Sequence, residues 1–300
     1  METEQTTIAD QIQVQKPKKK PQGWINLLKF ILPFIFVLAL FQFIGMLIAG
    51  VDVMHGQTKE QTPLQQFIIS VFSLIGTAGI VALFYKYVDQ KQLLSIGFTK
   101  GSILKDIVWG IALGMVLITG GFLILTTTGQ ISISTVQFNA RDFIFSFLLF
   151  VCVAISEELF SRGYFLTNLM ASMNKYLALG ISALLFCLLH IANSNVTFLS
   201  MTNIFLAGIL LGLPFIYTRQ LWFPIALHFS WNFFQGPVFG YSVSGTKTSA
   251  IFITKYSEAN IWNGGEFGFE GSIVSTFFLV AAIAIVYFLF RKRTAVEIEE

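Results

Sequence analysis

The chain has 300 residues, of which 55% are hydrophobic and 12% are charged, and its mean hydropathy is +0.72. An average soluble domain carries about 25% charged residues, so this composition excludes an ordinary soluble protein and indicates a polytopic membrane protein. The net charge of +3 does not indicate a nucleic-acid partner, because the basic residues lie between hydrophobic segments. Cys152 and Cys187 both lie in apolar segments, so no disulfide framework is expected.

Eight segments are candidate membrane spans, since a helix needs about 20 mainly apolar residues to cross a bilayer. A polar segment, residues 1–22, precedes them and is interpreted as a disordered cytoplasmic tail that leads into an uncleaved first span. We therefore expect an all-α polytopic membrane protein with about eight transmembrane helices. The candidate spans are 24–50, 67–85, 107–126, 143–165, 177–192, 198–217, 222–239 and 273–290.

The basic residues predict the orientation of these spans. With a cytoplasmic N-terminus, only Lys59, Arg141, Lys247 and Lys255 of the 19 Lys and Arg residues fall on the outer side. Because cytoplasmic loops carry an excess of Lys and Arg, both termini are expected in the cytoplasm and the chain in the cell membrane. The expected parts are the tail 1–22, three spans in 23–140, a four-span protease core in 141–240, and an outer loop with the last span in 241–300.

Two adjacent carboxylates, Glu157 and Glu158, lie inside the fourth candidate span, and Arg162 follows four residues later. A charge at the bilayer centre costs roughly 2.5–3.5 kcal/mol on insertion scales, so such residues are functional candidates by default. Neighbouring helical residues point to different sides, and Glu158 is spaced to pair with Arg162. Glu157 is then expected to face a cavity as a base. The simpler alternative is that these charges only reach water from a helix end.

Two of the three histidines, His190 and His228, also lie in apolar spans, whereas His55 lies in an outer loop and is interpreted as solvated. His228 and Asn232 are four residues apart and share a helix face. A single buried histidine is more often a core residue than a catalyst. However, each of these polar groups would need a buried partner, so we expect them to converge with Glu157 on one site.

The four side chains suit the hydrolysis of a peptide bond without a covalent intermediate. Glu157 and His190 would share a water and take its proton, and His228 and Asn232 would donate hydrogen bonds to the oxyanion. No cofactor is expected in this mechanism. The alternative is a catalytic zinc held by Glu157, His190 and His228, because two His and one Glu are a known ligand set with an open position. The chain lacks the usual HExxH zinc motif.

The expected helix boundaries do not bring these residues to one level. Counted from the cytoplasmic end of each span, His190 lies about 20 Å deep, Glu157 about 12 Å and His228 about 9 Å. A fourth helix that ends sooner, a fifth that begins nearer Ile181, or helix tilt would have to close this gap.

The same residues form three motifs in a fixed order. They read Glu157-Glu158-Leu-Phe-Ser-Arg162, Phe186-Cys-Leu-Leu-His190 and His228-Phe-Ser-Trp-Asn232, and between them Gly208 and Gly212 form a small-xxx-small step that lets helices approach closely. Over roughly residues 143–237 the chain resembles the CAAX prenyl protease and bacteriocin-processing family, also called CPBP or Abi.

The resemblance implies an intramembrane endopeptidase. It implies that Glu157 and His190 activate water, that His228 and Asn232 stabilise the oxyanion, and that Glu158 with Arg162 supports them. Substrates of this family are CAAX-type, pheromone or bacteriocin-like peptides. The expected partners are therefore a peptide or protein, lipidated or not, and the lipid bilayer, without nucleic acid.

Two other interpretations stay open. A non-catalytic immunity or scaffold protein would bind a peptide or membrane partner in the same cavity without cutting it, and a proton-coupled carrier would use the same groups as a relay. In the protease interpretation, we expect the cavity to open toward the cytoplasm or the inner leaflet, because the polar helix ends face that way.

Overall fold

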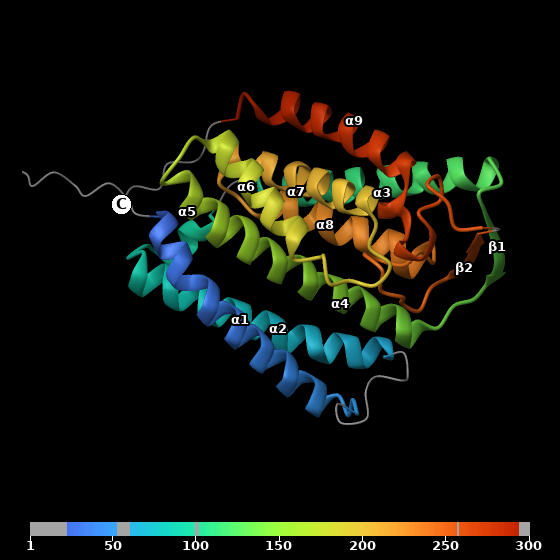
Figure 1. Cartoon of the computed structure of the whole chain (residues 1–300), viewed down its shortest axis with the longest axis horizontal. Coiled ribbons are helices and arrows are strands. Elements are labelled where there is room, and N and C mark those ends of the chain that lie inside the picture. The colour runs from blue at the N-terminus through green and yellow to red at the C-terminus, as the bar shows by residue number, and fades with distance from the viewer. Residues whose placement is uncertain (1–22, 53–60, 100–101, 257, 294–300) are drawn as a thin grey trace, which may run out of the picture.

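The structure is a computed structural model that describes residues 23–52, 61–99, 102–256 and 258–293. The predicted tail 1–22 and His55 lie outside the described residues. The chain folds into an elongated bundle of antiparallel helices with a two-stranded sheet at one end (Figure 1). The helices are α1 (Gly23–Ile48), α2 (Pro63–Leu83), α3 (Ile103–Thr127), α4 (Ala140–Glu158), α5 (Thr167–Met170), α6 (Lys175–Leu188), α7 (Phe198–Thr218), α8 (Trp222–Phe233) and α9 (Ile273–Phe290).

Shorter helical segments extend or connect these helices. Three are π-helical: η2 (Phe84–Val88), η4 (Leu159–Leu166) and η5 (Phe234–Val238). Three are single 3₁₀ turns: η3 (Leu93–Ile96), η6 (Gly265–Phe267) and η7 (Phe269–Gly271). Because η4 joins α4 to α5, one continuous helix runs over Ala140–Met170.

Six helices in the described part of the chain are long and apolar enough to cross a membrane. The expected helical, multi-pass membrane protein is therefore confirmed, but the count of eight spans is not. All eight expected segments are helical, yet α6 has only 14 residues and α8 only 12, or about 21 and 18 Å. These two short helices carry or adjoin the predicted histidines.

The all-α expectation missed one element, a two-stranded antiparallel sheet. Strand β1 (Ile131–Val136) follows α3, and strand β2 (Phe252–Tyr256) lies in the long segment before α9. Ile131 pairs with Tyr256, and Val136 pairs with Phe252. The alternating sequence Ile-Ser-Ile-Ser-Thr-Val is typical of a strand with one face toward solvent, so a local signal was present.

Side chains at the helix N-termini fix where several helices begin. Thr62 and Gln65 form a capping box at α2, with Pro63 in the first turn, and Thr197 and Ser200 form a second box at α7. Asn139 caps α4 by accepting hydrogen bonds from two backbone amides. These caps pair amide groups that would otherwise lack partners at the helix ends.

Helix α8 lies in the middle of the bundle, where it contacts α3, α4 and α7. Glycines on α3 allow this close packing, because a Cβ at Gly110 would lie 2.7 Å from the backbone oxygen of Phe223, and one at Gly114 would lie 2.8 Å from Cβ of Ser230. Ser230 Oγ also donates a hydrogen bond to the Ile111 carbonyl at 2.8 Å. Its neighbours on α8, His228 and Asn232, are thereby held near the molecular centre.

The two ends of the bundle differ. The described residues begin and end, at Gly23 and Arg293, at the end of the bundle where α5 lies, which we call the termini end (Figure 1). Strands β1 and β2 lie at the opposite end, which we call the sheet end (Figure 1). Helices α1 and α2 pack together along one side of the bundle, and α9 lies on the other side.

Candidate active site

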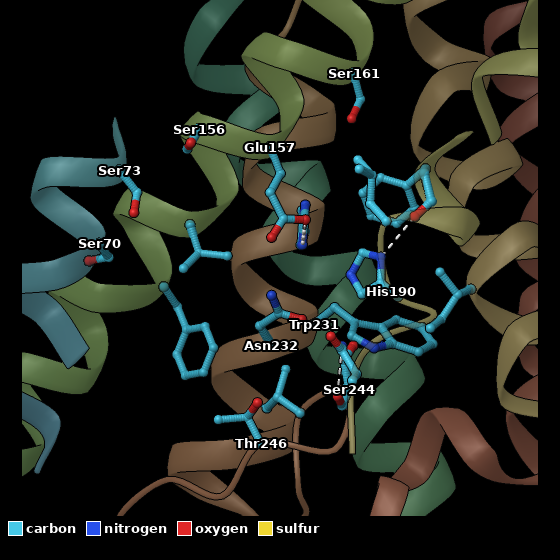
Figure 2. Close-up of a pocket in the computed structure, with 18 of the residues that line it drawn as sticks. Ser70, Ser73, Ser156, Glu157, Ser161, His190, Trp231, Asn232, Ser244 and Thr246 are labelled. Atoms are coloured by element: carbon cyan, nitrogen blue, oxygen red, sulfur yellow. Dashed lines mark hydrogen bonds and ion pairs between the residues drawn. The ribbon is translucent and has the colours of Figure 1, made fainter. Parts of the chain in front are cut away.

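A cavity of about 550 Å³ lies between the α1–α2 pair and the rest of the bundle. It is lined by residues of α1, α2, α4, α6, α7 and α8 and by the segment that follows α8. All four residues predicted to be catalytic line it, namely Glu157, His190, His228 and Asn232. Figure 2 shows Glu157, His190 and Asn232 directed into the same space. The structure thus brings together side chains from three separate segments of the chain.

The two glutamates have different surroundings. The Glu158 side chain is fully buried, at 0% exposure, and its Oε1 accepts a hydrogen bond from Arg162 Nη1 at 2.7 Å. The Glu157 side chain is 37% exposed and accepts no hydrogen bond from another described residue. The ion pair expected from the spacing is therefore present, and the neighbouring carboxylate is left open to the cavity.

Arg162 connects three helices. Besides Glu158, its Nη2 donates to the Gly208 carbonyl of α7 at 3.0 Å, and its guanidinium lies 4.6 Å from the ring centroid of Phe186 on α6. The side chain is only 1% exposed. Gly208 and Gly212 let α7 approach α6 closely, as expected, because a Cβ at Gly208 would lie 2.9 Å from Cα of Ala183.

His228 lies between the two carboxylates. Its Nδ1 donates to Glu158 Oε1 at 2.8 Å, and its Nε2 lies 3.8 Å from Glu157 Oε2. A carboxylate only accepts hydrogen bonds, so Nδ1 carries a proton in this arrangement. The remaining nitrogen, Nε2, faces Glu157 and the cavity, and it can donate a hydrogen bond only when the imidazole is doubly protonated.

His190 is held by the backbone in a different way. It lies in the turn just after α6, and its Nδ1 donates to the Phe186 carbonyl at 2.8 Å. A carbonyl is also only an acceptor, so the neutral ring keeps an unprotonated Nε2. The Phe186 ring lies against both histidines, with centroids 4.9 Å from His190 and 6.1 Å from His228. The phenylalanine of this motif therefore orients both imidazoles and Arg162.

Asn232 lies one helical turn after His228, and its side chain makes no hydrogen bond to another described residue while it lines the cavity. Directly after Asn232 and Phe233 the helix widens into η5, just as α4 widens into η4 directly after Glu158. Such π-helical turns are frequent at functional sites because they change the direction of neighbouring side chains. Their positions cannot be derived from the apolar periodicity.

The structure brings Glu157, His190 and His228 to one level, although the expected helix boundaries placed them at different depths. The fourth helix does not end sooner but continues to Met170, so Glu157 lies about 20 Å from the end of this helix at the termini end. This agrees with the depth expected for His190. The α8 helix begins inside the molecule, since Leu221 is fully buried and its amide donates to the Gly97 carbonyl. His228 therefore reaches the same level after only six residues.

Whether the cavity opens toward the cytoplasm or the inner leaflet, as expected, depends on the membrane orientation of the bundle, which stays a prediction, but the lining closes the cavity at the termini end. On that side the lining residues are buried, among them Phe160, Ser161 and Leu211. On the other side the lining includes the exposed Thr246 and the half-buried Asn193, whose side chain donates to the Ser244 carbonyl. The cavity therefore extends toward the sheet end.

Helix α2 contributes a polar face to the cavity that was not expected from the sequence. Gln66, Ser70, Ser73 and Thr77 line the cavity, and Ser156, next to Glu157, donates to Thr77 Oγ1 at 3.1 Å. The spacing of four, three and four residues inside an otherwise apolar helix is the signal that could have found them. We define these four residues as the α2 polar face.

A metal centre receives no support from the arrangement of ligands. No group of three or more His, Cys, Asp or Glu side chains in the described ranges is placed to hold a metal ion. Glu157, His190 and His228 line one cavity, but they do not form such a group. The choice between a metal-free site and a zinc site stays a prediction.

The fold and the cavity define a class: a multi-pass helical membrane protein with a polar, carboxylate- and histidine-containing cavity within its helices. A family model described as "Type II CAAX prenyl endopeptidase Rce1-like" matches residues 139–234, about a third of the chain. This segment contains all three motifs, so the resemblance to the CAAX protease family is confirmed over it. No similar curated protein and no similar solved structure was found.

Proposed function

We propose that this protein is an intramembrane endopeptidase that hydrolyses a peptide bond with a water activated by Glu157 and His190. The observation that carries the proposal is the convergence of the three motifs on one cavity, with Glu157 free of hydrogen bonds from other described residues. The family matched by residues 139–234 implies the same class of reaction. We place the protein in the cell membrane.

In the first step, the water loses a proton to Glu157 or His190 while its oxygen forms a bond to the peptide carbonyl carbon. Nε2 of His190 is suited to this task, because its Nδ1 is occupied by the Phe186 carbonyl and the neutral ring offers a lone pair. A positioned general base of this kind contributes typically 10²–10⁴-fold to the rate.

In the same step the carbonyl oxygen becomes an oxyanion. Asn232 donates to it through its amide, and His228, which lies between the two carboxylates, donates through Nε2 when its ring is doubly protonated. The proton taken from water then moves to the leaving nitrogen, and the C–N bond breaks. Glu158 and Arg162 take no part in proton transfer but fix the orientation of His228.

The substrate class follows from the family description and the cavity. We propose a peptide or protein segment of CAAX, pheromone or bacteriocin type, lipidated or not, which reaches the cavity within the membrane. No metal is included, since Glu157, His190 and His228 do not form a ligand group. The zinc mechanism remains the alternative that a chelator tests.

The test compares native protein with Glu157→Gln in proteoliposomes, with the released peptides identified by mass spectrometry. The control is Glu258→Gln, which makes the same substitution at an exposed residue between β2 and α9. We expect products from the native chain and from the control, at least 100-fold less from Glu157→Gln, and no effect of a chelator.

Two outcomes would contradict the proposal. Full activity of Glu157→Gln would exclude this carboxylate as the base, and loss of products under chelation would favour a zinc mechanism. If native protein binds peptides without releasing products, the non-catalytic immunity or scaffold function would replace the protease.

A further inference from the structure

The α2 polar face, formed by Gln66, Ser70, Ser73 and Thr77, points into the cavity instead of toward lipid. Thr77 lies eleven residues after Gln66, so the face is about 16 Å long, which is the length of about five residues of extended peptide. It begins at the sheet end, near the N-terminus of α2, and reaches Ser156 beside Glu157. The polar face therefore connects one end of the bundle to the candidate active site.

Polar groups without partners gather where this face begins. Oε1 of Gln66 and Oγ1 of Thr248 are buried and have no hydrogen-bond partner among the described residues, and both residues line the cavity. Buried polar atoms are normally paired, so such atoms in a cavity are suited to bind a polar ligand. A peptide backbone offers both the N–H donors and the C=O acceptors that a side-chain amide and hydroxyls can bind.

The end of the bundle that the cavity reaches is poor in basic residues. Described Lys and Arg residues at the sheet end are Arg141, Lys247 and Lys255. Those at the termini end are three times as many: Lys29, Lys86, Lys91, Lys105, Lys175, Arg219, Arg291, Lys292 and Arg293. Because Lys and Arg concentrate in cytoplasmic loops, this distribution orients the termini end toward the cytoplasm and the sheet end away from it.

We propose that the substrate enters from the extracytoplasmic side, as an extended peptide segment that lies along the α2 polar face and brings its scissile bond to Glu157. The short α6 makes this route available, because it ends at Leu188 and leaves His190 in a turn instead of closing the bundle toward the sheet end. The proposal rests on the proposed endopeptidase for the cleavage step, but the route itself does not depend on cleavage.

The experiment uses single-cysteine variants of the full chain in which Cys152 and Cys187, both free thiols, are replaced by alanine. A membrane-impermeant thiol reagent, sulfonatoethyl methanethiosulfonate, is applied to intact cells and to inside-out membrane vesicles. Ser73→Cys reports the polar face, and Ile75→Cys is the matched control on the outward, exposed side of the same helix. Lys247→Cys and Lys292→Cys report the two ends of the bundle.

We expect Lys247→Cys and Ser73→Cys to react in intact cells, Lys292→Cys to react only in inside-out vesicles, and Ile75→Cys to react in neither. Reaction of Ser73→Cys only in inside-out vesicles, or in neither preparation, would overturn the proposal, as would the reverse orientation of the two end reporters. These readouts need no enzymatic activity, so they separate the route from the protease function.

A second measurement connects the route to cleavage. Modification of Ser73→Cys is expected to lower the release of peptide products at least 10-fold, whereas the same treatment of Ile75→Cys leaves release unchanged. Unchanged cleavage after complete modification of Ser73→Cys would show that the substrate does not use this face. If native protein releases no peptides at all, the proposed protease is wrong, while the labelling result still decides the route.

Discussion

The ion pair between Arg162 and Glu158 allows a quantitative test of how the site is held. Arg162→Met keeps much of the side-chain volume but removes the cation, so Glu158 is left as a buried carboxylate whose Oε1 has only His228 as a donor. Breaking a buried pair by removing one partner typically costs about 3–5 kcal/mol. Both side chains are almost completely buried, so solvent screening does not reduce this cost.

The expected shift in melting temperature follows from the size of the chain. One kcal/mol corresponds to roughly 2 °C in proteins somewhat smaller than this one, so Arg162→Met is expected to melt about 6–10 °C lower. The double variant Arg162→Met, Glu158→Gln contains no unpaired charge, and we expect it to recover at least half of this shift. Arg162→Lys should also destabilise, because one ammonium cannot reproduce the planar contacts to Glu158, Gly208 and the Phe186 ring.

The assay is thermal unfolding of purified protein in detergent micelles at one fixed scan rate, with activity measured in parallel. The opposite result is that the two single shifts add. The melting temperature of the double variant would then lie below that of Arg162→Met by the same amount by which Glu158→Gln alone lowers that of the native chain. Such additivity would mean that the two side chains do not interact, although they lie 2.7 Å apart.

Three further variants test other contacts of the site. Asn232→Ala should lower kcat about 10²–10³-fold with little change in melting temperature, measured on a peptide that the native chain cleaves, if its amide binds the oxyanion. Gly208→Ala should destabilise by about 1–3 kcal/mol in thermal unfolding, because the new methyl group meets the α6 backbone, whereas Gly79→Ala, which meets no atom within 4 Å, should be neutral or stabilising. Glu270 Oε2 accepts hydrogen bonds from Ser244 N and Ser244 Oγ at 2.7 and 2.8 Å, so Glu270→Gln should lower the unfolding free energy by about 1.5–3 kcal/mol. The Ser244 amide should lose protection from hydrogen exchange by a matching amount.

The sequence predicted those parts of the site that depend on spacing along one helix. Glu158 and Arg162 are four residues apart, and that spacing alone was enough to predict their contact and to leave Glu157 on another side. The apolar segments were also sufficient to predict the long helices, because six of them are long and apolar enough to cross a membrane. Local chemistry therefore determines these features.

Features that depend on packing between distant segments could not be derived in this way. His190 falls inside the expected span 177–192, but in the structure it lies in a turn after a helix of only 14 residues. The contact between His228 and Glu158 joins residues 70 positions apart, and periodicity carries no information about which of two adjacent glutamates a distant histidine will meet. The continuation of α4 through η4 to Met170 also depends on a run of buried residues, not on any helix-stop signal.

Under the proposed mechanism, the contrast between Glu157 and Glu158 gives each of the two carboxylates a separate role. Oε1 of Glu158 accepts hydrogen bonds from Arg162 and His228, and the side chain is fully buried and does not line the cavity, so it can orient an imidazole but does not meet a substrate water. Glu157 has the same chemical group but faces the cavity without such donors, so its oxygens remain available. A single carboxylate could not both hold His228 and accept a proton from the water. It follows that Glu158→Gln should impair the orientation of His228 more than it impairs proton transfer. In Glu157→Gln, the remaining carboxylate of Glu158 should not restore the lost activity.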